Sequence, residues 1–170
     1  HQAMVGMNLG YEFSGAMDGL RVAVHMLRGD VDDDALAQFN KTDLNMTGGS
    51  VAYLENDWEV LGEYYRFNNK DKSGGTGSHS SWADYLQVGK TFDALTPYLR
   101  MEKTVLSQLD KYFSMQDSGQ SYTRQALGLK YDLNQKASLK LELHYSDFAA
   151  EAGRTAYSYH SLYAQYAIRF

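Results

Sequence analysis

The chain of 170 residues contains no cysteine and only one proline. Without cysteine there is neither a disulfide framework nor a thiolate metal site, and the redox compartment stays undetermined. No apolar run approaches 18 residues and the mean hydropathy is -0.50, which excludes a membrane-spanning helix. The net charge of -5 argues against a nucleic-acid partner. A membrane strand is still allowed, because it needs apolar residues only at alternate positions.

Aromatic residues, in contrast, are plentiful. The sequence has 14 Tyr, 7 Phe and 2 Trp, or 14% aromatic residues. This content suits a membrane protein with aromatic girdles at its two water interfaces. A hydrophobic content of 44% is also ordinary for a soluble protein. The alternative is therefore a tyrosine-rich soluble β-sandwich or barrel that binds an apolar ligand.

The C-terminal eleven residues alternate in character. Counting back from the terminus, every second position is apolar or aromatic: Phe170, Ile168, Tyr166, Ala164 and Leu162. The positions between them carry Ser161, Tyr163, Gln165, Ala167 and Arg169. This period of two predicts a β-strand, one face of which could meet hydrocarbon while the other meets water.

The same alternation recurs upstream and predicts eight further strands. They are expected at about 3–13, 20–27, 44–54, 58–67, 82–92, 96–104, 124–131 and 137–146. Pro97 lies at a strand start, where its missing N–H is tolerated. A bulge is expected near Gly48 and Gly49, because the apolar pattern changes face there. The connections alternate between short turns and long polar loops, the latter at 29–43, 68–80, 105–120 and 147–155.

This terminus resembles the C-terminal strand of bacterial outer-membrane β-barrels, with Tyr166, Ile168 and Phe170 as the membrane-insertion signal. The stretch Leu95–Arg100, LTPYLR, is similar to strand openings in Gram-negative porins. The resemblance implies an all-β, transmembrane antiparallel up-and-down β-barrel in the outer membrane. It implies a trimeric porin surrounded by lipid and lipopolysaccharide, through which small hydrophilic solutes and ions diffuse, with no enzymatic activity and no cofactor.

Strand parity extends this expectation. If Phe170 lies on the periplasmic side, the ninth strand descends, and so does the first. A single-chain bacterial barrel begins with an ascending strand and has an even strand number. We therefore expect residues 1–170 to be the C-terminal part of a barrel of about 16 strands, a size that encloses an aqueous channel. A barrel of 8 to 12 strands is the smaller alternative.

Charged side chains opposite the apolar stripes are expected to line the lumen, because a charge is costly on the lipid face. They are Arg21, His25, Glu59, Glu63, Arg100, Glu102, Arg124, Lys130, Lys140, Glu142 and His144. Rings of such charges bias ion passage. The alternative is that they pair with one another, for example Glu102 with Arg124 on adjacent strands, and only hold the wall rigid.

Other functions receive weaker support from the sequence. The pairs His144 with Ser146 and His160 with Ser161 suggest a hydrolase, but no third group is placed to orient the histidine. The run from Asp30 to Asp34 offers alternate oxygen ligands, yet the glycine and glutamate of an EF-hand loop are missing at their spacing. A solvated acidic loop is the favoured interpretation of that run. A barrel that only scaffolds or docks a partner is a further alternative.

Overall fold

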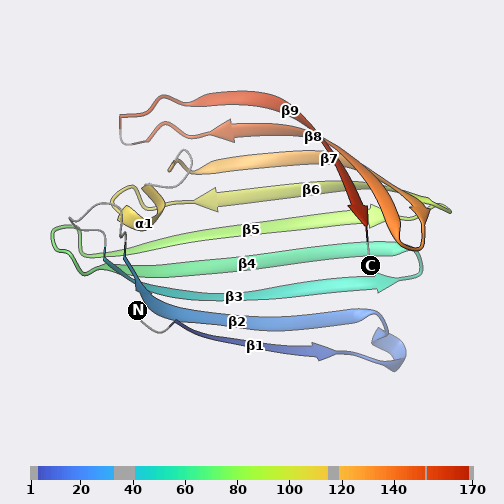
Figure 1. Cartoon of the computed structure of the whole chain (residues 1–170), viewed down its shortest axis with the longest axis horizontal. Coiled ribbons are helices and arrows are strands. Elements are labelled where there is room, and N and C mark those ends of the chain that lie inside the picture. Colours follow the sequence, from blue (N-terminus) through green and yellow to red (C-terminus); the bar gives the residue numbers. More distant parts are fainter. Residues whose placement is uncertain (1–3, 33–40, 115–118, 152, 169–170) are drawn as a thin grey trace.

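The computed structural model describes residues 4–32, 41–114, 119–151 and 153–168. Nine strands form one antiparallel sheet, and each strand pairs with its neighbours in the sequence (Figure 1). The strands are β1 (Val5–Glu12), β2 (Leu20–Val31), β3 (Thr42–Glu55), β4 (Trp58–Asp71), β5 (Ser78–Lys90), β6 (Leu95–Val105), β7 (Tyr122–Asn134), β8 (Ala137–Phe148) and β9 (Tyr157–Ile168). The prediction of an all-β, antiparallel up-and-down arrangement is confirmed.

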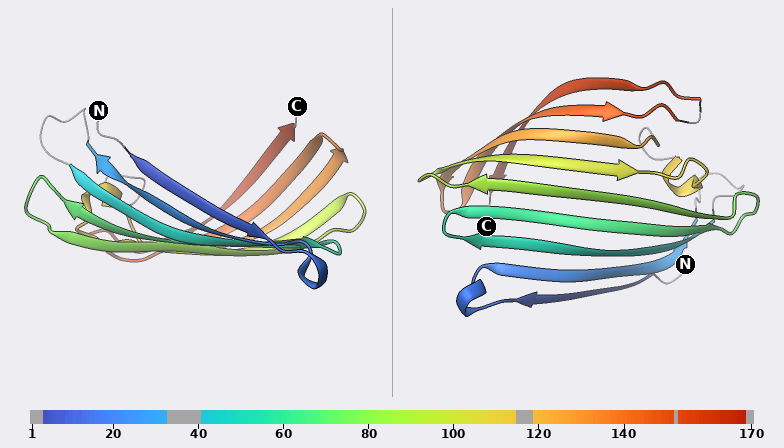
Figure 2. Two further views of the ribbon diagram at one scale, coloured as in Figure 1. Left: turned by 90° about the horizontal axis from the view of Figure 1, so that it is seen from below. Right: turned by 180° about the vertical axis from the view of Figure 1, so that it is seen from behind.

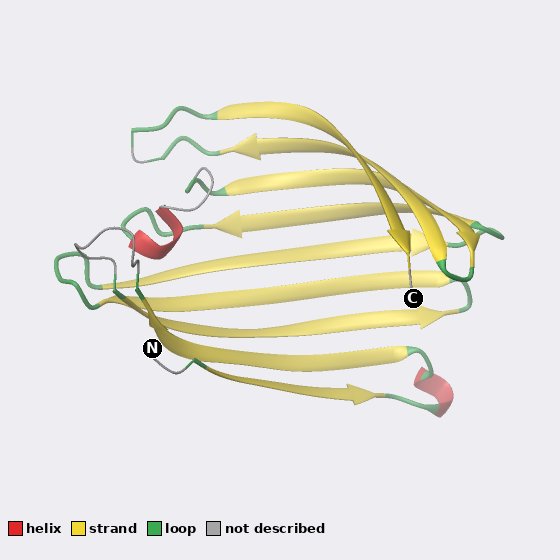
Figure 3. Ribbon diagram, viewed as in Figure 1, coloured by secondary structure: helices red, strands yellow, loops and turns green. Residues whose placement is uncertain are grey.

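Two short helices interrupt this pattern at opposite ends of the strands (Figure 3). The 3-10 helix η1 (Gly15–Met17) lies in the β1–β2 turn, and α1 (Lys111–Ser114) lies in the connection between β6 and β7. Asn56 and Asp57 make the β3–β4 turn with positive φ values of 54° and 64°. Such values are typical of a tight two-residue hairpin turn. No helix of the described residues is long and apolar enough to span a membrane.

Several strands are longer than predicted at the long-loop end. The ladder between β2 and β3 continues to Val31 and Thr42, and β4 continues to Asp71. The apolar alternation stops before these positions. Polar residues can still form the main-chain hydrogen bonds between strands, so the strands extend beyond the apolar pattern from which they are predicted. Of the acidic run that begins at Asp30, residues 33 and 34 lie outside the described residues.

The bulge predicted near Gly48 and Gly49 is wrong. Gly48 pairs with His25 on one side and with Tyr65 on the other, and the register is continuous on both sides. The glycine serves another purpose, because a Cβ added to Gly48 would lie 2.8 Å from the Tyr65 ring atom Cε1. The strand register is instead irregular between Asp132 and Asn134, at the turn into β8.

The sheet curls into an open trough, with β1 and β9 at its two rims (Figure 2). In the described residues these two edge strands do not pair with each other. Large apolar side chains cover the convex face and remain exposed, for example Leu127 at 62% and Leu162 at 72%. Among the described residues, four buried side chains are hydrophobic and ten are polar or charged. This order is the reverse of that in a soluble protein.

Candidate functional site

All eleven charged residues predicted for the lumen lie on the concave face. The strand pairing decides this, because cross-strand partners share a face and alternate residues switch faces. Their density differs along the wall, with the strands β6, β7 and β8 carrying seven of them: Arg100, Glu102, Arg124, Lys130, Lys140, Glu142 and His144. We call the concave face of these three strands the charged wall.

Glu142 is the centre of the charged wall. Its carboxylate accepts a hydrogen bond from the Tyr98 hydroxyl at 2.6 Å and lies 3.2 Å from both Lys140 Nζ and a guanidinium nitrogen of Arg100. His144 Nε2 approaches the second carboxylate oxygen at 3.4 Å. The Glu142 side chain is only 12% exposed. A carboxylate so little exposed needs this ring of donors to remain ionised.

Glu102 organises the neighbouring contacts. Arg100 Nε donates to one Glu102 oxygen at 2.7 Å, and a guanidinium nitrogen of Arg124 lies 3.3 Å from the other. Arg124 Nε also donates to Ser146 Oγ at 2.9 Å, and Arg100 reaches Gln87 Oε1 at 3.4 Å. The pairing of Glu102 with Arg124, which belongs to the alternative that these charges hold the wall rigid, is present. The cations of this wall are thus held by carboxylates and do not stand free toward the trough.

A tyrosine lying over a glycine connects strands of the wall that are not direct neighbours. Tyr98 on β6 pairs with Gly128 on β7, which pairs with Glu142 on β8. The Tyr98 ring occupies the place of the missing Gly128 side chain, and this position allows its hydroxyl to reach Glu142. Tyr65 lies over Gly48 in the same way. Sequence analysis missed both pairs, although a glycine inside an alternating strand indicates close approach of another group.

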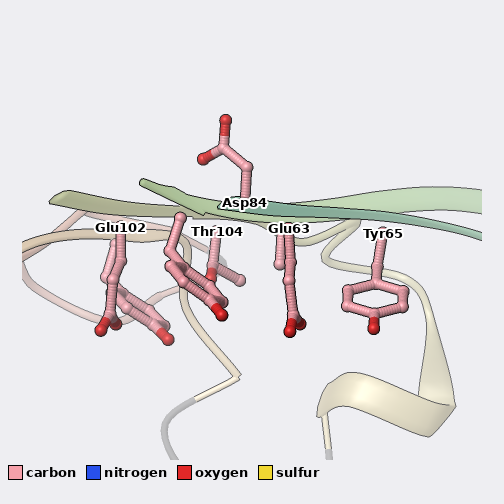
Figure 4. A pocket seen from close by; sticks show the side chains of 8 residues that line it. Glu63, Tyr65, Asp84, Glu102 and Thr104 are labelled. Atoms are coloured by element: carbon pink, nitrogen blue, oxygen red, sulfur yellow. The ribbon is translucent and has the colours of Figure 1, made fainter. Parts of the chain in front are cut away.

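The concave face of β4 and β5 is different, because no ion pair with another described residue holds its two glutamates. Glu59 accepts a hydrogen bond from Gln87 Nε2 at 2.5 Å. Glu63 interacts with the hydroxyls of Tyr65 and Tyr85. Neither glutamate forms an ion pair with another of the residues that the structure describes. In Figure 4, Glu63 and Tyr65 project to one side of the sheet and Asp84 to the other.

The connection between β6 and β7 folds onto the concave face at the long-loop end. Ser107 N donates to Ser81 Oγ at 3.0 Å, and Asn69 Nδ2 donates to Asp110 Oδ2 at 2.9 Å. The rings of Phe67 and Phe113 meet edge to face, with centroids 5.0 Å apart. Burial raises the pKa of the Asp110 carboxyl above its usual value, and the Asn69 hydrogen bond opposes this rise. Strands β4 and β5 therefore anchor this connection inside the trough.

The remaining predicted residues are placed more simply. His25 bonds Ser50 at 3.2 Å, Lys130 pairs with Asp132 at 3.1 Å, and Arg21 forms a 2.8 Å pair with Glu12. The two partners of the last pair are 64% and 66% exposed, so their attraction is screened by water. Tyr166 and Ile168 of the predicted insertion signal lie at the end of the convex face of β9, where they are 57% and 50% exposed. Phe170, the third residue of that signal, lies outside the described residues.

The geometry of a hydrolase is not assembled by the predicted pairs. Ser146 Oγ accepts its hydrogen bond from Arg124, not from a histidine. His144 lies opposite Ser161 across the β8–β9 pairing, but the Ser161 hydroxyl has no hydrogen-bond partner among the residues that the structure describes. A serine–histidine pair needs one ring nitrogen for the serine and the other for the acid. Among the described residues no three His, Asp or Glu side chains are grouped to hold a metal ion.

Comparison with known proteins adds no family assignment. No protein-family model matches the sequence, and no curated protein matches it. The function must therefore be argued from the two faces of the sheet.

Proposed function

We propose that this chain is part of a porin of the bacterial outer membrane, in which small hydrophilic solutes and ions diffuse passively along the concave face. Lipid, including lipopolysaccharide, covers the convex face. The observation that carries this proposal is the direction of the apolar band on the convex face. That band does not run perpendicular to the strands but crosses them obliquely.

One row of cross-strand partners shows the oblique course. On β1 and β2 the row contains Leu9 and Val24, whereas on β5 and β6 it contains Asp84 and Lys103. The row then ends at Ser158 on β9. The apolar band has therefore moved toward the short-turn end of the later strands. A flat membrane cuts strands tilted by about 35–45° in this way, which is the tilt that barrel closure requires.

Aromatic side chains line both borders of the band. Trp58, Tyr131 and Tyr166 lie exposed toward the short turns, at 44%, 47% and 57%. Toward the long loops, Tyr64 and Trp82 lie with their ring centroids 6.2 Å apart. Aromatic girdles at two interfaces flank the apolar band of outer-membrane barrels. Both borders support a membrane location for the strands between them.

The open edges of β1 and β9 support a larger barrel. Unpaired main-chain N–H and C=O groups cost several kcal/mol each in hydrocarbon, so a membrane sheet must close on itself. Nine strands with the observed open trough leave room for further strands between these edges. We propose a whole of about 16 strands, large enough for a water-filled lumen. The trimer belongs to the same proposal and rests on the porin resemblance alone.

A matched pair of substitutions tests the membrane assignment. Leu141 on the convex face is 49% exposed, and its neighbour Lys140 pairs with Gln165 on the concave face. If Leu141 faces lipid, Leu141→Arg should lower the free energy of unfolding by about 2 to 4 kcal/mol. If Leu141 faces water, the same substitution should change that free energy by no more than about 0.5 kcal/mol. Gln165→Arg is the control and should be tolerated. Unfolding free energies of the complete protein in lipid vesicles give the comparison, and equal values for both variants would reject the membrane face.

Single-channel recording of the complete protein tests the porin function itself. We expect ohmic conductance through the water-filled lumen. A folded barrel that does not conduct would favour the scaffold or docking alternative. Hydrolysis of a lipid ester that is lost in Ser161→Ala would favour the enzyme.

A further inference from the structure

A small hollow lies on the concave face, between the charged wall and the β4–β5 carboxylates. It has a volume of ≈ 140 Å³. Figure 4 shows the side chains that line it. Ala83 forms its floor, because Ala83 pairs with Tyr65 on one side and with Thr104 on the other, and its methyl group fills little of the space between them. Tyr122 pairs with Thr104 and closes the far side. The hollow exists because a small residue lies in a row of larger ones.

Two carboxylates and a phenol form the border of the hollow on the side of the short turns. Glu63, Tyr85 and Glu102 are consecutive partners in the next row of the sheet. In Figure 4 the carboxylates of Glu63 and Glu102 point to the same side of the sheet as the Tyr65 ring. The hollow is therefore lined by three tyrosines and two glutamates, which supply aromatic faces and negative charge together.

The two carboxylates differ in their neutralisation. Glu102 pairs with both Arg100 at 2.7 Å and Arg124 at 3.3 Å. Glu63 interacts only with phenol hydroxyls and has no cation partner among the residues that the structure describes. Among the described residues, no cation therefore balances the negative charge of Glu63 at the border of the hollow. A cation already lies on one of the rings, since the Arg124 guanidinium is 4.9 Å from the Tyr122 centroid.

We propose that this hollow binds a small organic ammonium ion, with Glu63 as the counter-charge and the tyrosine rings around the carbon atoms. Aromatic faces with a nearby carboxylate attract alkylammonium groups through the ring quadrupole and charge. A water molecule takes about 30 Å³ in the liquid, so the hollow has room for a compact cation of a few carbon atoms. The inference names a solute class for the proposed porin and rests on that function only in needing a water-filled concave face.

Other ligand classes fit the hollow less well. A divalent metal ion prefers six or more oxygen ligands, and of the two glutamates that line the hollow on this side of the sheet only Glu63 lacks a cation partner among the described residues. An anion would meet the negative charge of Glu63, and the Arg124 guanidinium on the Tyr122 ring is already paired with Glu102. A neutral ligand of the same shape would gain the ring contacts but not the charge. The distinguishing property of the site is thus its preference for positive charge at fixed shape.

The test is binding of tetramethylammonium to the complete protein in detergent micelles, measured by isothermal titration calorimetry. The neutral isostere tert-butanol is the ligand control. Glu63→Gln removes the charge, and Ala83→Leu fills the hollow. Glu59→Gln is the matched control, because Glu59 lies on the same face of β4 but is bonded to Gln87 outside the hollow.

We expect tetramethylammonium to bind the unaltered protein and the Glu59→Gln variant alike. Affinity should fall about tenfold in Glu63→Gln, equal to about 1.4 kcal/mol, and be lost in Ala83→Leu. Circular dichroism verifies that each variant is folded. Equal binding of tert-butanol, or unchanged affinity for tetramethylammonium in either Glu63→Gln or Ala83→Leu, would overturn the proposal. Calorimetry does not depend on conduction, so a conducting protein that fails to bind the cation rejects the site and leaves the porin standing.

Discussion

Replacing Gly128 by alanine should destabilise the sheet through Tyr98. The added methyl group would overlap the ring atoms Cε2 and Cζ and the hydroxyl oxygen of Tyr98, so the ring must leave its place. The hydroxyl then loses its 2.6 Å hydrogen bond to Glu142, and hydrogen bonds to charged groups contribute about 1.5 to 3 kcal/mol. Tyr98 is only 4% exposed, and overpacking at such a site costs about 1 to 3 kcal/mol more.

A gain offsets part of this loss, because alanine restricts the unfolded chain more than glycine by about 0.5 to 1 kcal/mol. The expected net loss is about 2 to 5 kcal/mol. Urea unfolding of the complete protein in lipid vesicles, followed by the emission of Trp58 and Trp82, measures it. Gly10→Ala is the matched control on the same face, since its added Cβ would have its nearest heavy atoms at 3.7 Å.

The double variant decides whether Tyr98 is the cause. In a Tyr98→Ala background, Gly128→Ala should cost little or should stabilise, because the ring that it would displace is gone. If Gly128→Ala costs the same in both backgrounds, the tyrosine contact is not the origin of the effect. An unchanged unfolding free energy in the single variant would refute the reasoning altogether.

Three further predictions concern the concave face of the sheet. Gly48→Ala should destabilise by about 1 to 3 kcal/mol in the same unfolding assay, because its added carbon would also meet a main-chain oxygen of β4 at 2.6 Å; a neutral result contradicts it. Replacing Arg100, Arg124 and Lys140 together by glutamine should make the channel more selective for cations, because the carboxylate partners stay charged. The reversal potential under a salt gradient measures this change. An unchanged potential would mean that the three residues only stabilise the wall. Protection of the β6–β7 connection from proteolysis should rise as pH falls from about 7 toward about 4, because the raised pKa of Asp110 favours its protonated form in the fold. Asp110→Asn should abolish that dependence, and a variant that retains it would show that another group titrates.

The strands could be predicted because alternation is a local property. Leu139, Leu141 and Leu143 alternate with charged residues and are all on the convex face, as their spacing requires. Strand ends were less predictable, because polar residues such as Asp30 and Asp71 pair their main chains without an apolar signal. Gly48 does not mark a bulge, because its missing side chain leaves room for the ring of Tyr65, a residue on another strand.

The site shows the same division between local and distant information. The face of each charged residue follows from its parity in the strand, and the pairing of Glu102 with Arg124 follows from hairpin order. The contact of Tyr98 with Glu142 spans 44 positions of sequence and depends on Gly128 between them. The inward fold of the β6–β7 connection depends on Asn69 meeting Asp110. Neither contact can be predicted from a local sequence pattern, because its partners are far apart in the sequence.

The reach of Tyr98 across β7 also bears on how the sheet opens. Hydrogen-bonded strands alone would allow a hairpin to separate at either of its borders, and exchange of its amide protons would report that small event. Here β7 cannot leave β6 or β8 without disturbing a side chain fixed on both of them. We therefore expect the smallest cooperative unit to be a group of three strands. Amide protons in the middle of β7 should exchange with the slowest class, together with those of β6 and β8.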